Sequence, residues 1–70
     1  MICPRCDEQG LIYRARVVNL EIELYICDEC DACWTNRNVI SIENFKDLST
    51  FLKEHGLTYE NSEIENLGYI

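Results

Sequence analysis

Residues 25–34 read YICDECDACW and place three cysteines, Cys27, Cys30 and Cys33, close together in the chain. A further Cys-x-x-Cys pair, Cys3 and Cys6, lies in MICPRC at residues 1–6. Two such pairs in a chain that reads as cytoplasmic are more typical of a metal site than of a disulfide framework. The pattern therefore predicts a tetrahedral site with one cysteine pair at each end of the intervening segment.

Spacing favours Cys27 and Cys30 as the partners of the first pair. Between Cys6 and Cys27 lie 20 residues, whereas pairing Cys30 with Cys33 gives 23, and ribbon-type sites usually have about 15 to 20. The residue after each knuckle often needs left-handed backbone, which Asp31 and Asp7 tolerate. The predicted ligands are Cys3, Cys6, Cys27 and Cys30, with Cys33 as an alternative ligand.

The predicted ion is structural zinc. Four thiolates fill its coordination shell and leave no position for water or substrate. Iron in a four-sulfur shell is the alternative. Zinc binding contributes on the order of 10–16 kcal/mol in small zinc peptides, more than a core of this size usually nets. We therefore expect folding to depend on the metal.

Three further residues have simple expected roles. Cys33 is expected to be a small, half-buried apolar residue at the start of a third strand, the alternative being a reserve ligand or redox trigger. Trp34 is expected in the core. His55 is expected at the surface, near the last carbonyl groups of a helix.

The segment between the cysteine pairs alternates in polarity, which predicts a β-hairpin. In LEIELYIC, residues 20–27, the aliphatic side chains fall on one face and Glu21, Glu23 and Tyr25 on the other. A turn centred on Val18 and Asn19 would place Arg16 opposite Glu21 and Arg14 opposite Glu23. A four-residue loop, which keeps the faces but shifts the partners, is the alternative because Val18 suits a tight turn poorly.

Residues 41–56 change to a helical period. The side chains of Phe45, Leu48, Phe51 and Leu52 share one side of the predicted helix. Ser41 is a candidate N-cap, and Gly56 is a candidate left-handed stop. Residues 57–70 form an acidic C-terminal segment with apolar anchors, in which Ser62 and Glu65 would cap one helical turn.

These elements predict one domain over residues 1–70, with residues 1–40 as the ribbon with two cysteine knuckles, 41–56 as the helix and 57–70 as the acidic segment. The expected fold is small α+β, a hairpin or three-stranded antiparallel sheet with one C-terminal helix packed on it. Two Cys-x-x-Cys pairs on a hairpin resemble a zinc ribbon, which implies that the four cysteines named above hold zinc. The glycine that usually follows each knuckle in that class is replaced here by Asp7 and Asp31.

The charge disfavours several classes of function. The chain has 13 acidic and 6 basic residues and a formal net charge of −7. Four thiolates (−4) and one zinc ion (+2) would make it more negative still. Such a surface repels phosphate backbones, so no direct nucleic-acid binding is expected. No catalytic set or phosphate-binding loop appears, so neither catalysis nor a small-molecule substrate is expected. No segment reads as a membrane span or a signal peptide, so a cytoplasmic location is expected.

An acidic module with a closed metal site is best interpreted as a binder of a basic protein partner. In size, acidity and layout the chain is also similar to small bacterial immunity proteins of contact-dependent growth inhibition and other polymorphic toxin loci. That resemblance implies an immunity protein or antitoxin that neutralises a toxin such as a nuclease. A zinc-ribbon adaptor or regulator in a transcription or translation assembly is the alternative, and a redox or metal-transfer protein using Cys33 is a third hypothesis. The candidate partner contacts are Asp28, Glu29, Asp31, Glu60, Glu63 and Glu65, with Tyr59, Tyr69 and Ile70 as anchors.

Overall fold

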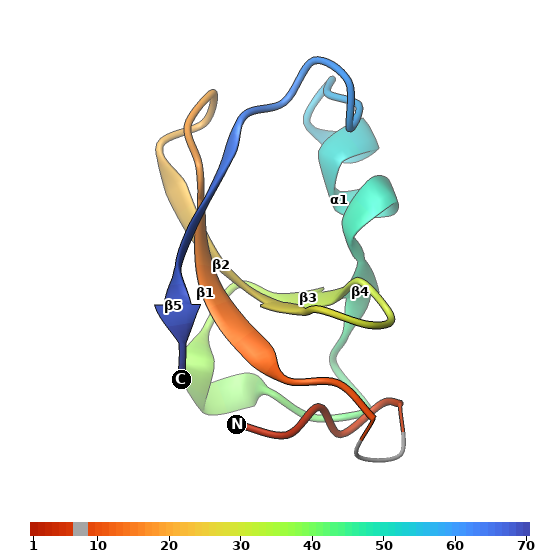
Figure 1. Ribbon diagram of the computed structural model, residues 1–70. Coiled ribbons are helices and arrows are strands. Elements are labelled where there is room, and N and C mark those ends of the chain that lie inside the picture. Colours follow the sequence, from red (N-terminus) through yellow and green to blue (C-terminus); the bar gives the residue numbers. More distant parts are fainter. Residues whose placement is uncertain (7–8) are drawn as a thin grey trace.

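The computed structural model describes residues 1–6 and 9–70, and these form one five-stranded antiparallel sheet with one short α-helix. In chain order the elements are β1 (Ile12–Val17), β2 (Ile22–Cys27), β3 (Ala32–Trp34), the 3-10 turn η1 (Arg37–Val39), β4 (Lys46–Asp47), α1 (Leu48–Glu54) and β5 (Ile64–Tyr69). The spatial order is β4-β3-β2-β1-β5. The predicted small α+β class is confirmed, but the sheet exceeds three strands and the helix is followed by a strand (Figure 1).

The hairpin between β1 and β2 uses the longer of the two predicted loops. Val17 pairs with Ile22, so residues 18–21 form a four-residue loop. The turn centred on Val18 and Asn19 is therefore wrong, and the alternative is confirmed. The loop needs one left-handed residue, and Glu21 supplies it with φ +55°. Val18 is spared that conformation, which its branched Cβ disfavours.

The shift in register preserves the faces of the hairpin but changes the charge pairs. Arg16 lies opposite Glu23 on β2 and opposite Glu65 on β5. Arg14 reaches Glu23 diagonally, with 3.7 Å between Nε and Oε1. These charged side chains are exposed on the face of the sheet opposite Ala15, Val17, Leu24 and Ile26. The residues directly opposite Arg14 and Arg16 are shifted by two positions from the prediction, so Glu21 pairs with neither arginine, but the predicted Arg14–Glu23 charge pair is retained as the diagonal contact.

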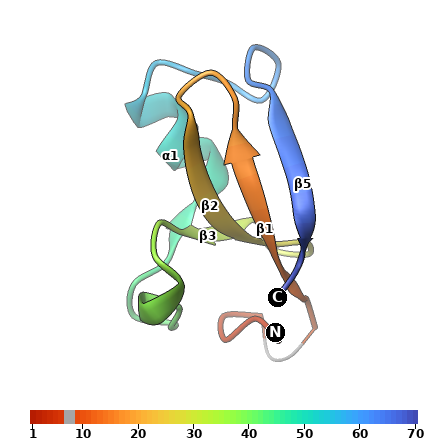
Figure 2. The ribbon, with the colours of Figure 1, turned by 90° about the vertical axis from the view of Figure 1, so that its left-hand side faces the viewer.

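Helix α1 covers one face of the sheet, behind β1 and β2 in Figure 2. Its buried residues Leu48, Phe51 and Leu52 pack with Ala15, Val17, Leu24, Ile26 and Cys33. The helix ends as predicted, with Gly56 at φ +75°. His55 is exposed, and its Nδ1 lies 2.9 Å from the carbonyl oxygen of Phe51.

The start of the helix was predicted too early. Residues 41–47 are not helical, and β4 pairs with β3 through Lys46 and Cys33. The carbonyl of Ser41 accepts a hydrogen bond of 3.0 Å from Trp34 Nε1, so Ser41 holds the tryptophan and is not a helix cap. Phe45 packs beside Trp34 on the other face of the sheet. Pairing with β3 and burial of Phe45 outweigh the local helical period.

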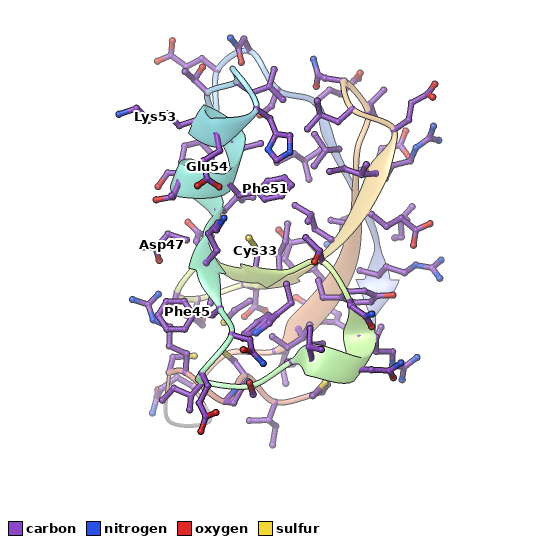
Figure 3. All side chains as sticks on the ribbon, turned by 180° about the vertical axis from the view of Figure 1, so that it is seen from behind. Cys33, Phe45, Asp47, Phe51, Lys53 and Glu54 are labelled. Carbon is purple, nitrogen blue, oxygen red and sulfur yellow. The ribbon has the colours of Figure 1, made fainter. Side chains whose placement is uncertain are left out.

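A second hydrophobic cluster lies on the face of β2 and β3 opposite α1. Its buried members are Cys3, Ile12, Cys27, Ala32 and Trp34, and Phe45 and Ile70 pack against them. Figure 3 shows Cys33 and Phe51 on one side of β3 and Phe45 on the other. Burial of Trp34 in this cluster, with 2% exposure, confirms its predicted place in the core. The two cysteine knuckles are therefore built into a core of their own.

The C-terminal segment forms a strand where a helical turn capped by Ser62 was predicted. Strand β5 pairs with β1, and the flanking amides of Val18 and Ile70 donate to the carbonyls of Glu63 and Ile12. Without β5, the edge of β1 would present unpaired backbone groups. The two chain ends lie together (Figure 1), where the ammonium group of Met1 donates to the carbonyl of Ile70.

Candidate metal centre

The first knuckle is residues 3–6, which precede β1. The amide of Cys3 donates to the carbonyl of Gly10 at 2.9 Å, and Ile2 forms a bridge with Leu11, so the segment folds back on the entry to β1. The backbone amide of Arg5 donates a hydrogen bond of 3.4 Å to Cys3 Sγ. Asp7, predicted to complete this turn, lies outside the described residues.

The second knuckle joins β2 to β3. Cys27 is the last residue of β2, and Cys30 lies in the turn before Ala32. The amide of Glu29 donates to Cys27 Sγ at 3.4 Å. Asp31 has φ +59°, which confirms the left-handed conformation predicted after the knuckle. The chain can therefore reverse within four residues and enter β3 directly.

The sulfur atoms of Cys3, Cys6, Cys27 and Cys30 all lie within 4.8 Å of one another. The distance is 3.8 Å between the sulfurs of Cys3 and Cys30 and 3.5 Å between those of Cys6 and Cys27. In a tetrahedron with Zn–S bonds of about 2.3 Å, sulfurs are about 3.8 Å apart. The cluster therefore has the donor set and the dimensions that a divalent ion such as zinc requires.

Burial makes the thiols of Cys3 and Cys27 poor acids unless a cation is present. Cys3 and Cys27 are fully buried, and burial raises the pKa of Cys3 and raises that of Cys27 to about 12. At Cys30 burial also acts to raise the pKa, but hydrogen bonds from the Ala32 amide and neighbouring thiols outweigh it, so the net pKa is lowered. A metal ion offsets the cost of buried thiolates, so this donor set fits a bound cation.

Cys33 does not belong to the group of four. It is 2% exposed and packs against α1, on the opposite side of β3 from Ala32. Burial raises its pKa to about 11. Because side chains alternate along a strand, Cys33 faces α1 while the four clustered cysteines lie on the other side. It lies in the third strand as predicted, but it is fully buried where a half-buried side chain was expected, and its side chain is directed away from the centre.

The aspartates of the second knuckle hold the C-terminal segment. Asp28 Oδ1 accepts the Leu11 amide at 3.0 Å, and its Oδ2 accepts the hydroxyl of Tyr69 at 2.9 Å. The Leu11 amide, and then the Tyr69 hydroxyl, lower the pKa of Asp28. Asp31 Oδ2 accepts the hydroxyl of Tyr59 at 3.3 Å. Two candidate partner contacts are thus bound to two candidate anchors of the same chain.

The other predicted contacts are exposed glutamates. Glu29 lies in the knuckle, whereas Glu60, Glu63 and Glu65 lie on the C-terminal segment. The side chain of Asn19 ties that segment to the hairpin loop, because its Nδ2 donates to the carbonyl of Asn61 and its Oδ1 accepts the amide of Glu63. Within the part of the chain that the structure describes, none of these four carboxylates forms a salt bridge. The six predicted contacts therefore fall into two groups, three in the knuckle and three on the C-terminal segment.

Sequence reasoning missed two residues of the centre, Gly10 and Arg5. Gly10 is buried, and a Cβ added there would overlap Cys27 Sγ and lie 3.0 Å from Glu29 Cβ. A glycine four residues past the first knuckle was the available signal. Arg5 lies between two ligands, and its side chain crosses to the second knuckle. No local pattern shows such a contact.

Comparison with known protein families, with curated proteins and with solved structures finds no match to this chain. The description of the site therefore depends on its own geometry. The described residues include no helix with the length and apolarity needed to cross a bilayer. The predicted cytoplasmic location stays a prediction.

Proposed function

We propose that the chain is a zinc-stabilised, non-catalytic binding module of the zinc-ribbon type, whose acidic surface docks on a basic protein. The observation that carries the zinc-ribbon part of this proposal is the four-sulfur cluster joining the two knuckles. Four thiolates saturate a tetrahedral ion, so the metal would hold the fold and leave no position for a substrate. The centre would then serve as scaffold for a surface that acts by binding.

Charge supports the choice of a basic partner. The formal net charge is −7, and loading zinc on four thiolates makes it more negative. Glu60 and Glu63 are exposed next to the hairpin loop, where Asn19 holds the segment in place. Asp28 and Asp31 are already engaged by tyrosines. We therefore assign the contact to the exposed glutamates of the C-terminal segment, Glu60, Glu63 and Glu65.

Neutralisation of a toxin is one form of this function. A nuclease toxin needs a basic surface to attract phosphate, and an acidic protein can cover that surface by charge complementarity. The alternative form is an adaptor in a transcription or translation assembly, which would bind a basic protein within a larger complex. A neighbouring gene for a basic toxin would favour the first form, and co-purification with a stable assembly would favour the second.

The test is affinity capture from the native host with the zinc-loaded protein at low and at high salt. We expect the wild type to retain a basic protein at low salt and to release it at high salt. Glu60→Gln/Glu63→Gln should retain much less of it. The control Glu43→Gln/Glu54→Gln changes the net charge equally on exposed residues elsewhere and should bind as the wild type does. Capture of nucleic acid, or equal retention by both double variants, would contradict the proposal.

A further inference from the structure

Arg5 makes an unusual set of contacts around the proposed metal centre. It lies between Cys3 and Cys6, and its Nη1 donates to the carbonyl of Cys30 at 3.2 Å and to Asp47 Oδ1 at 3.1 Å. An Nη atom carries two hydrogens, so both bonds can form at once. One side chain thereby links the first knuckle, the second knuckle and β4.

The planar guanidinium group of Arg5 also stacks on an aromatic ring. Its central carbon lies 4.4 Å from the centroid of the Phe45 ring, which itself packs on the cluster that contains Cys3 and Cys27. A planar guanidinium can stack and hydrogen-bond in its plane at the same time, which a lysine ammonium cannot do. Phe45 and Asp47 therefore fix the side chain of Arg5 over the second knuckle.

The carbonyl that Arg5 binds belongs to the part of the turn that orients a ligand. The peptide after Cys30 leads into Asp31, whose left-handed backbone at φ +59° turns the chain directly into β3. A bond to the Cys30 carbonyl limits rotation of that peptide. The backbone amide of Arg5 also donates a hydrogen bond to Cys3 Sγ. Arg5 thus acts on one ligand from each knuckle.

Electrostatics works in the same direction. A divalent ion on four thiolates leaves two negative charges at the centre. Among the described basic residues, Arg5 is the one whose side chain forms a hydrogen bond to a knuckle. The carboxylate of Asp47 offsets part of the positive charge of Arg5. We therefore expect Arg5 to strengthen metal binding more by orienting the turn than by its charge.

We infer that Arg5 is a positioning residue of the metal centre, which strengthens metal binding by clamping the two knuckles together. This inference rests on the proposed function, because it requires the four cysteines to bind a metal. Groups that orient metal ligands typically change affinity by about 10- to 100-fold when they are removed. Arg5 is expected to fall in that range.

The test measures metal affinity in Arg5→Met, Arg5→Lys and the wild type. Co²⁺ gives the absorption spectrum of the centre, and Zn²⁺ affinity follows from competition with a chelator of known strength. Arg5→Met should bind Zn²⁺ about 10- to 100-fold more weakly, while the Co²⁺ spectrum still indicates four sulfur ligands. Arg5→Lys should lose less affinity than Arg5→Met, since it retains the charge but lacks the planar group.

Arg37→Met is the matched control, because Arg37 is an exposed arginine of η1 whose side chain forms no salt bridge within the described residues. It should bind Zn²⁺ as the wild type does. Affinity of Arg5→Met within about twofold of the wild type, or an equal loss in Arg37→Met, would overturn the inference. If Arg5→Met does not fold, wild-type affinity of Arg5→Lys would overturn it. A wild type that binds neither ion would refute the metal centre itself, which is a distinct result.

Discussion

The hydroxyl of Tyr69, on the last strand, donates a hydrogen bond of 2.9 Å to Asp28 inside the second knuckle. The ring of Tyr69 also meets that of Tyr13 edge-on, with 6.2 Å between centroids. The end of the chain is therefore fastened to the loop that carries two of the four clustered cysteines. The protection of β5 against local unfolding should therefore depend on its attachment to this knuckle.

Tyr69→Phe tests this coupling, because it keeps the ring and removes only the hydroxyl. We expect faster hydrogen exchange in residues 63–70, with the rest of the sheet unchanged, since β5 loses one of its attachments. Tyr25→Phe is the control, because Tyr25 forms no side-chain hydrogen bond within the described residues. Hydrogen exchange followed by mass spectrometry measures the protection of residues 63–70 in both variants. Equal protection of residues 63–70 in Tyr69→Phe and the wild type would argue against the attachment.

Gly10→Ala should disturb the metal centre directly. The added Cβ would overlap Cys27 Sγ and press on the side chain of Glu29, and overpacking of this kind costs about 1–3 kcal/mol. We expect weaker Co²⁺ binding and a lower melting temperature. Gly68→Ala is the matched control, since Gly68 has open space around it but φ +107°. Because folding and metal binding are coupled, it should lower the melting temperature by strain and lower Co²⁺ affinity only in proportion. Gly10→Ala should lose more Co²⁺ affinity than its loss of stability accounts for.

Cys33→Ala and Cys30→Ala should separate the fifth cysteine from the other four. Cys33 lies under α1, so its loss should cost on the order of 1 kcal/mol of buried contact and leave one zinc ion per chain. Cys30 is one of the clustered four, so Cys30→Ala should lower zinc affinity sharply. Native mass spectrometry under reducing conditions measures the stoichiometry. Loss of zinc from Cys33→Ala would show that the ligand set was assigned wrongly.

Metal affinity should fall as the pH falls. Near neutral pH an ordinary cysteine thiol is mostly protonated, and burial in the folded chain raises the pKa of Cys27 to about 12 and also raises that of Cys3, so these thiols are protonated before metal binds. Loading then releases more than one proton, and the apparent affinity should drop by more than about tenfold per pH unit. Competition titrations between about pH 7.5 and pH 6 test this, and calorimetry in two buffers counts the protons. An affinity independent of pH would mean that the thiols do not bind the ion.

The cysteine spacing and the alternating hairpin were readable from the sequence because both are local patterns. Spacing, supported by an aspartate that tolerates left-handed backbone after Cys30, distinguished the pair Cys27 and Cys30 from Cys33, and the structure places Cys33 on the other side of β3. The left-handed Asp31 followed from the demands of a tight turn. Local stereochemistry therefore predicted the cluster and its second knuckle.

Strands β4 and β5 were missed because distant partners create them. Residues 46–47 are extended because they pair with β3, although their own sequence fits the helix that follows. Strand β5 pairs with β1 through an irregular register, and Gly68 has φ +107° there. Neither segment shows regular alternation, so no periodicity could predict it. The contacts of Arg5 with Cys30 and Asp47 were hidden for the same reason.

Metal analysis and chelation of the wild type, purified under reducing conditions, give the decisive test of the proposed metal centre. Elemental analysis should find one zinc ion, or another divalent ion, per chain. Removal with a strong chelator should abolish the dispersed amide spectrum of the folded sheet, and added zinc should restore it, because the proposed ion joins the two knuckles. A chain that contains no stoichiometric metal, or that keeps its folded spectrum after chelation, would contradict the central claim.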